Sequence, residues 1–133
     1  MSSWSEEAPS LPCVLPIRRI RVLLLSRDRR FLRVTAFLLR RKGFVVESGA
    51  RPEAALVERH RPDVVVIDGN GSVRDAVRSL AEIETRWPAV AFLVVCEEAP
   101  ERRGLLFRFV PKWSAGDRLA DEVERAYLRR DPA

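Results

Sequence analysis

Short apolar runs alternate along the chain with longer segments in which apolar residues recur at helical spacing. The apolar runs predict five strands, at Ile20–Leu25, Phe44–Glu47, Val64–Ile67, Val90–Val95 and Leu105–Val110. Val64–Ile67 and Val90–Val95 are apolar at every position, which is typical of strands buried on both faces of a parallel sheet. The alternation therefore predicts an α/β domain built from repeated strand–helix units.

Helices are expected in the gaps between these strands. The first should run from about Asp28 to Lys42. Its predicted buried stripe consists of Phe31, Val34 and Leu38. The later helices are expected at about Pro52–His60 and Ser72–Arg86, in a shortened form between Cys96 and Leu105, and from Ser114 past Tyr127. Since strand–helix–strand connections are right-handed, these helices should cover both faces of the sheet.

The N-terminal segment differs from the rest, because it contains three prolines and shows no periodicity. We expect a flexible leader over residues 1–17, one domain over 18–130 and a short tail over 131–133. Trp4 in the leader could dock on a partner, although an ordinary exposed aromatic is the simpler interpretation. We expect no effector domain after the final helix and therefore expect a stand-alone module.

The composition excludes several classes of protein. Of the 133 residues, 47% are hydrophobic and 32% are charged, a balance typical of a soluble globular chain. The longest apolar run, Val90–Cys96, is far shorter than the ~20 residues that cross a bilayer. Glu6 and Glu7 replace the basic start of a secretory signal, so we expect a cytoplasmic protein. Two cysteines and one histidine provide neither a disulfide framework, a Cys/His metal cluster nor a hydrolase triad, and we predict no enzyme.

Positive charge is concentrated near the start of the predicted domain. The net charge is +5, yet Arg18–Lys42 alone contains ten basic residues and one acid. Arg29, Arg33 and Arg40 fall on one side of the predicted first helix. This face could be simply solvated or could dock on an acidic protein surface. Binding of nucleic acid is less favoured, because the chain has no helix-turn-helix, zinc finger or interleaved stacking aromatics.

Polar residues follow the predicted strands at the edge where open parallel sheets bind ligands. These residues are Ser26, Arg27, Asp28, Asp68, Cys96 and Lys112. A carboxylate such as Asp68 at the end of an apolar strand is costly to bury without a cation, and Lys112 can supply one. Asp68 could be a nucleophile that accepts a phosphoryl group, with Lys112 stabilising the added charge. The alternative, a pair that only satisfies a buried turn, remains open at this point.

Four segments, in this order, make the chain resemble the receiver domains of bacterial response regulators. They are Arg41–Val46, Glu53–Leu56, Arg61–Asp68 and Phe109–Lys112. The resemblance covers roughly residues 20 to 130. It implies a flavodoxin-like fold, with a five-stranded parallel sheet in the order 2-1-3-4-5 and helices on both faces.

By position, Asp68 matches the phosphoacceptor of the family and Lys112 its characteristic lysine. Cys96 stands where the family usually has Thr or Ser, and Phe109 stands at the switch aromatic. The sequence departs from the family after the first strand, where two acidic residues normally hold Mg²⁺ and this chain has Ser26–Arg27.

This departure predicts a degenerate receiver. Mg²⁺ requires oxygen ligands, whereas Ser26 is a poor ligand and Arg27 would repel the ion. Arg27 could instead pair with Asp68 and take the place of the metal, which would hold the site in one state. We therefore expect a signalling module that binds a protein partner, with little or no Mg-dependent phosphorylation and no cofactor.

Two alternatives remain open. In the first, the chain is a conventional receiver that a histidine kinase phosphorylates on Asp68, with Mg²⁺ held by Asp28, Asp68 and the carbonyl of Asn70. In the second, it is a nucleic-acid-associated regulator that binds through the basic first helix. A homodimer through the surface around the fourth helix, fifth strand and fifth helix is compatible with any of these interpretations.

Overall fold

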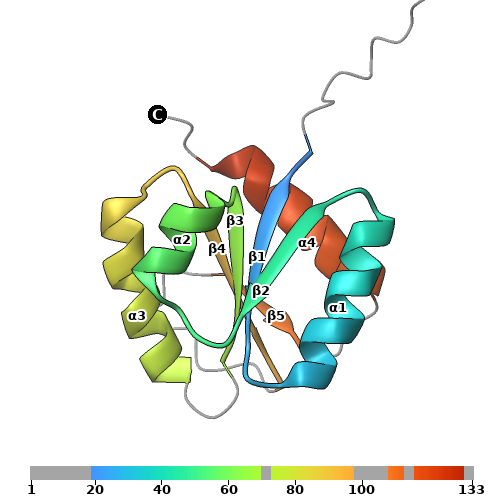
Figure 1. Ribbon diagram of the computed structural model, residues 1–133, viewed down its shortest axis with the longest axis horizontal. Helices are drawn as coiled ribbons and strands as arrows, with labels where there is room; N and C mark the ends of the chain where they lie inside the picture. Colours follow the sequence, from blue (N-terminus) through green and yellow to red (C-terminus); the bar gives the residue numbers. More distant parts are fainter. Residues whose placement is uncertain (1–18, 70–72, 98–107, 113–115, 131–133) are drawn as a thin grey trace, which may run out of the picture.

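The computed structural model describes residues 19–69, 73–97, 108–112 and 116–130. Within them the elements are, in chain order, β1 Arg21–Leu25, α1 Arg29–Arg41, β2 Val45–Gly49, α2 Ala54–His60, β3 Val64–Asp68, α3 Val73–Arg86, β4 Ala91–Cys96, β5 Arg108–Pro111 and α4 Gly116–Arg129 (Figure 1). The strands form one parallel sheet in the order β2-β1-β3-β4-β5. The predicted α/β fold and strand order are confirmed.

The register of the sheet brings the carboxyl ends of the central strands to one level. Leu25 of β1 lies opposite Ile67 of β3, so the residues that follow them, Ser26 and Asp68, are neighbours. On the other side of β3, Asp68 lies opposite Val95 of β4. This alignment places Asp68 between the ends of two strands, where the topology predicts a functional site.

Two layers of helices bury the sheet. Helices α1 and α4 cover one face, and α2 and α3 cover the other (Figure 1). The first layer packs Phe31 and Leu39 of α1 and Val123 of α4 against the sheet. The second packs Val57 of α2 and Leu80 of α3. Because β3 is apolar on both faces, it contributes to both cores, as its sequence predicts.

The predicted buried stripe of α1 is right only at Phe31, since Leu38 is half-buried and Val34 is exposed. Val34 is 41% exposed, and the side chains that α1 buries are those of Phe31, Thr35, Ala36 and Leu39. The true stripe follows the spacing i, i+4, i+8, with Thr35 at a position where an apolar residue is expected. Val34 therefore lies on the outer side of the helix together with Phe37, which is 58% exposed.

A polar cluster connects distant segments of the chain at the amino ends of the strands, opposite the end that carries Asp68. Asp63, just before β3, accepts a hydrogen bond from the backbone N–H of Arg21 at 2.9 Å. Arg130, just after α4, lies 3.8 Å from the other oxygen of Asp63 and donates a hydrogen bond to the carbonyl of Ala89. We call this set of residues the Arg130 clasp. It connects the end of α4 to the starts of β1 and β3.

Some predicted features lie outside the described residues. These are the leader with Trp4, the loop residue Asn70, the shortened fourth helix and the tail. Among the helices that the structure does describe, none is long and apolar enough to cross a membrane.

Candidate functional site

Asp68 forms the centre of a hydrogen-bonded cluster at the carboxyl edge of the sheet. Its side chain is 6% exposed. The Ser26 hydroxyl donates a hydrogen bond to Asp68 Oδ2 at 2.7 Å, and Lys112 Nζ lies 2.9 Å from the same oxygen. A buried carboxylate requires such donors, since burying a charge without a partner lowers the stability of the fold by roughly several kcal/mol. The Asp68–Lys112 contact agrees with the strand topology that the sequence predicts.

Lys112 bridges two carboxylates. Its ammonium group, on a side chain only 2% exposed, contacts Asp28 Oδ2 at 3.0 Å as well as Asp68. It also lies 5.2 Å from the centre of the Phe31 ring, within the range of a cation–π contact. Burial alone would lower the pKa of Lys112, but the hydrogen bonds to Asp68 and then Asp28 outweigh it, and the pKa is raised above the ordinary 10.5. The bridge therefore remains charged at neutral pH.

Asp28 has two structural roles in this cluster. It is the N-cap of α1, where its Oδ1 accepts a hydrogen bond from the Phe31 N–H at 3.1 Å. Its Oδ2 accepts from Lys112, and this hydrogen bond, followed by the one from Phe31, lowers the pKa of Asp28 below the ordinary 3.8. The backbone N–H of Asp28 donates to Ser26 Oγ at 2.9 Å. The start of α1 is thereby tied to the Asp68 cluster.

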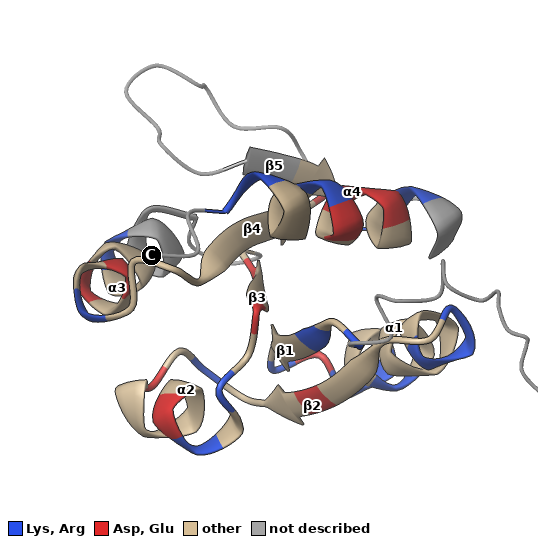
Figure 2. Cartoon of the chain, turned by 90° about the horizontal axis from the view of Figure 1, so that it is seen from above, with Lys and Arg blue, Asp and Glu red and all other residues tan. Residues whose placement is uncertain are grey.

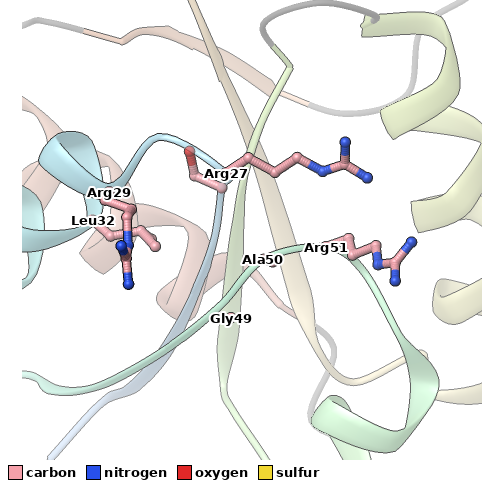
Figure 3. Close-up of a pocket in the computed structure, with 7 residues that line it drawn as sticks. Arg27, Arg29, Leu32, Gly49, Ala50 and Arg51 are labelled. Atoms are coloured by element: carbon pink, nitrogen blue, oxygen red, sulfur yellow. The ribbon is translucent and has the colours of Figure 1, made fainter.

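The predicted pairing of Arg27 with Asp68 is wrong. Arg27 is exposed, and within the described residues the cation next to Asp68 is Lys112. Figure 3 shows the Arg27 side chain extending to the same side of the view as that of Arg51. Consecutive residues at a strand end point in opposite directions, so Arg27 points away once Ser26 faces Asp68.

The sequence places Ser26 in the site but does not predict its role there. Its hydroxyl donates a hydrogen bond to Asp68 and accepts one from the backbone of Asp28. The signal available in the sequence was positional: Ser26 follows the first predicted strand directly, and Asp68 follows Val64–Ile67 in the same way.

Sequence comparisons assign no relatives to this chain. No protein-family model matches it, and no curated protein matches it.

Solved structures, in contrast, match it over most of its length. A CheY-like response regulator receiver domain protein from Methanospirillum hungatei is 17% identical, with a TM-score of 0.71 over 83% of this chain and 94% of that one. The receiver domain of the putative response regulator NarL from Mycobacterium tuberculosis is 16% identical, with a TM-score of 0.70 over 84% and 98%. The receiver domain of Francisella response regulator 1452 is 15% identical, with a TM-score of 0.71 over 84% and 98%.

This chain has the receiver fold. The likeness concerns the arrangement of the chain. In that arrangement Asp68 ends β3 and Lys112 follows β5 at the same end of the sheet, and the lysine side chain reaches Asp68 at 2.9 Å although β4 lies between the two strands.

The sequence also assigns Cys96, Phe109 and Asn70 to the site, and the structure describes these three residues to different extents. Cys96, the last residue of β4, is buried, and burial followed by the charge of Asp68 raises the pKa of its thiol above the ordinary 9.0. The thiol is therefore protonated at neutral pH and behaves as a small apolar group. Phe109 lies in β5 opposite Val94, and its side chain is outside the described part of the structure. The same holds for the whole of Asn70.

The predicted basic face of α1 is present on the receiver fold. Arg29, Arg33 and Arg40 are all exposed, and every charged segment of α1 in Figure 2 is basic. Arg40 also has a structural role, because its guanidinium donates a hydrogen bond to the carbonyl of Val46 in β2 at 2.8 Å. Arg29 and Arg33 therefore remain the stronger candidates for contact with a partner.

Proposed function

We propose that this chain is a receiver-like signalling module that acts by binding a protein partner, with little or no Mg-dependent phosphorylation of Asp68. The observation that carries the proposal is the buried bridge from Lys112 to Asp28 and Asp68, completed by the Ser26 hydroxyl. These contacts hold the edge of the sheet in one arrangement without any added group. No enzymatic reaction of its own is proposed for the module.

The residues of the site fit Mg²⁺ poorly. The ion requires oxygen ligands in a nearly octahedral array. Asp68 Oδ2 accepts from both Ser26 and Lys112, and both oxygens of Asp28 accept hydrogen bonds. In the described part of the chain, no group of three or more His, Cys, Asp or Glu side chains is placed to hold a metal. The proposed function therefore includes no step through a metal ion.

The outer side of α1 supports a protein partner. It presents Arg29 and Arg33 together with the exposed apolar side chains of Val34 and Phe37. Arg41 lies 5.7 Å from the centre of the Phe37 ring, so charge and apolar area are adjacent. Such a mixed basic and apolar surface is complementary to an acidic protein surface with apolar contacts of its own.

A phosphorylation assay tests the proposal. The full chain is incubated with acetyl phosphate and Mg²⁺ and its intact mass is measured. We expect no phosphoryl adduct on the wild-type chain. An adduct that Asp68→Ala abolishes would overturn the proposal. Ser26→Asp is the positive control, because it adds a carboxylate next to Asp68 and Asp28 and should give the chain measurable Mg²⁺ binding by calorimetry.

One observation favours a second candidate function. Asp68 and Lys112 are 2.9 Å apart, and a lysine in this position could stabilise a phosphoryl group on the carboxylate. The chain would then be a conventional receiver, phosphorylated on Asp68 by a histidine kinase. The same mass measurement separates the two candidates, since this one requires the adduct.

A further inference from the structure

A shallow hollow of about 660 Å³ lies beside the Asp68 cluster, between the segments that follow β1 and β2 and the first turns of α1 (Figure 3). Three arginines from three segments line it: Arg27, Arg29 and Arg51. We propose that this hollow binds a small organic phosphate that carries at least two phosphate charges, the class to which nucleoside diphosphates belong. Ser26, which donates to Asp68, also lines the hollow, but the three arginines are not part of the Asp68–Lys112 bridge.

The charge of the hollow is poorly compensated within the described residues. None of the residues that line it is acidic. Arg51 lies 3.6 Å from Glu53, but both side chains are more than half exposed, and such pairs contribute little. No ion pair of Arg27 or Arg29 is found in the described part of the chain. Three cations around one hollow repel each other, and a bound polyanion would relieve this repulsion.

The position of Arg29 provides an independent argument. The first turn of α1 contains no acidic residue and begins with Arg29 and Arg30. The N-terminus of a helix carries partial positive charge, so basic residues there are unfavourable for the stability of the helix. The N-cap carboxylate of Asp28 offsets part of this positive charge, and a phosphate bound beside Arg29 would offset more of it.

The remaining lining of the hollow indicates an organic ligand. Besides the three arginines and Ser26, it consists of the half-buried side chain of Leu32 and the segment Gly49–Ala50. Figure 3 shows Arg27 and Arg51 extending to one side of this segment and Arg29 lying on the other side. Guanidinium groups suit the bidentate binding of phosphate oxygens, and the apolar side chain of Leu32 suits contact with the ring of an attached organic group.

Calorimetric titration of the full chain in Mg-free buffer at low salt tests the proposal. The probes are ADP, GDP, pyrophosphate, inorganic phosphate and adenosine. We expect at least one nucleoside diphosphate to bind more tightly than pyrophosphate, which should in turn bind more tightly than inorganic phosphate. Affinity should fall as salt is added, because the contacts are between charges. Arg27→Gln combined with Arg51→Gln should weaken binding about tenfold for each arginine.

A matched control separates a site from general attraction. Arg118→Gln combined with Arg129→Gln removes the same charge from exposed residues of α4 that do not line the hollow, and should leave the affinity within about threefold. The proposal is overturned if neither nucleotide binds, if pyrophosphate or adenosine binds as tightly as both nucleotides, or if the control variant loses as much affinity. Absence of nucleotide binding would leave the proposed function untouched, because that function is tested separately by the phosphoryl adduct on Asp68.

Discussion

At the scale of single residues, Lys112 compensates the negative charges of Asp28 and Asp68 at the carboxyl end of the sheet. A lysine with 2% of its side chain exposed is stable only because two carboxylates accept its hydrogen bonds. Removing the lysine would leave the nearly buried Asp68 without its cation. Removing the charges of Lys112 and Asp68 together would leave no unpaired charge at Asp68.

The pH dependence of stability should report this bridge. The pKa of Lys112 is raised on folding, so the unfolded chain releases this proton first as pH rises. The stabilisation from the bridge should be complete below pH 10.5 and should be lost as pH rises through the pKa of the folded state. The Cys96 thiol, whose pKa is also raised, should begin the decline from about pH 9.0. Urea unfolding at a series of pH values measures the free energy of unfolding.

Two variants isolate the contribution of Lys112. Lys112→Met should lower the free energy of unfolding at neutral pH by about 3 kcal/mol, because it leaves a buried charge unpaired. Lys112→Met combined with Asp68→Asn should recover part of this loss. The decline above pH 10.5 should be weaker in both variants than in the wild type. An alkaline decline of unchanged size in Lys112→Met would show that other groups cause it.

The sequence predicts which residues lie at the same end of the sheet, but it does not predict in which direction each side chain points. The parallel arrangement of the strands was sufficient to place Asp68 and Lys112 at one end of the sheet, where their side chains meet. The direction of Arg27 depends on which of two consecutive residues faces Asp68, and the exact end of a strand cannot be read from an apolar run. Since Ser26 faces Asp68, the cation that sequence reasoning assigned to Arg27 is supplied by Lys112 instead.

At the scale of elements, α1 shows why helix orientation is hard to predict. The helix has more apolar residues than positions on its buried face. Its sequence is therefore compatible with two rotations, one that buries Val34 and Leu38 and one that buries Thr35 and Leu39. The helix buries Thr35 and leaves Val34 and Phe37 outside. Packing against the sheet and α4 therefore determines the rotation of the helix, and these contacts are not visible in the local sequence.

Alanine substitutions check this rotation of α1. Leu39→Ala should lower the free energy of unfolding by about 2–5 kcal/mol, because Leu39 is fully buried in the core. Val34→Ala should change it by less than about 0.5 kcal/mol, since Val34 is on the outer side. Chemical denaturation of the two variants and the wild type gives both values. Similar losses in the two variants would mean that the helix is rotated from its position here.

At the scale of the whole molecule, the sheet joins two hydrophobic cores that share its central strands. The alternation of apolar runs with helical segments was sufficient to predict this architecture, because strands buried on both faces have a distinctive sequence. β3 is paired on both sides and its valines are fully buried, whereas β2 is paired to β1 at the edge of the sheet.

Hydrogen exchange should follow this hierarchy. The amides of Val65 and Val66 should exchange only through opening of the whole domain, because both cores must open to expose them. Amides of β2 should exchange faster, on the order of tenfold or more, through local opening of the edge. Exchange measured by NMR, corrected for intrinsic rates, gives the comparison. Equal protection in β2 and β3 would contradict a division into edge and centre.

The Arg130 clasp has a consequence for how the molecule could be tethered. Arg130 and Asp63 fasten the end of α4 to the strand starts, on the edge of the sheet away from Asp68. A fluorescent label, affinity handle or fused protein attached behind this arginine would pull on the beginnings of β1 and β3. Lys112 and the arginine-lined hollow lie at the other ends of these strands, away from the point of attachment.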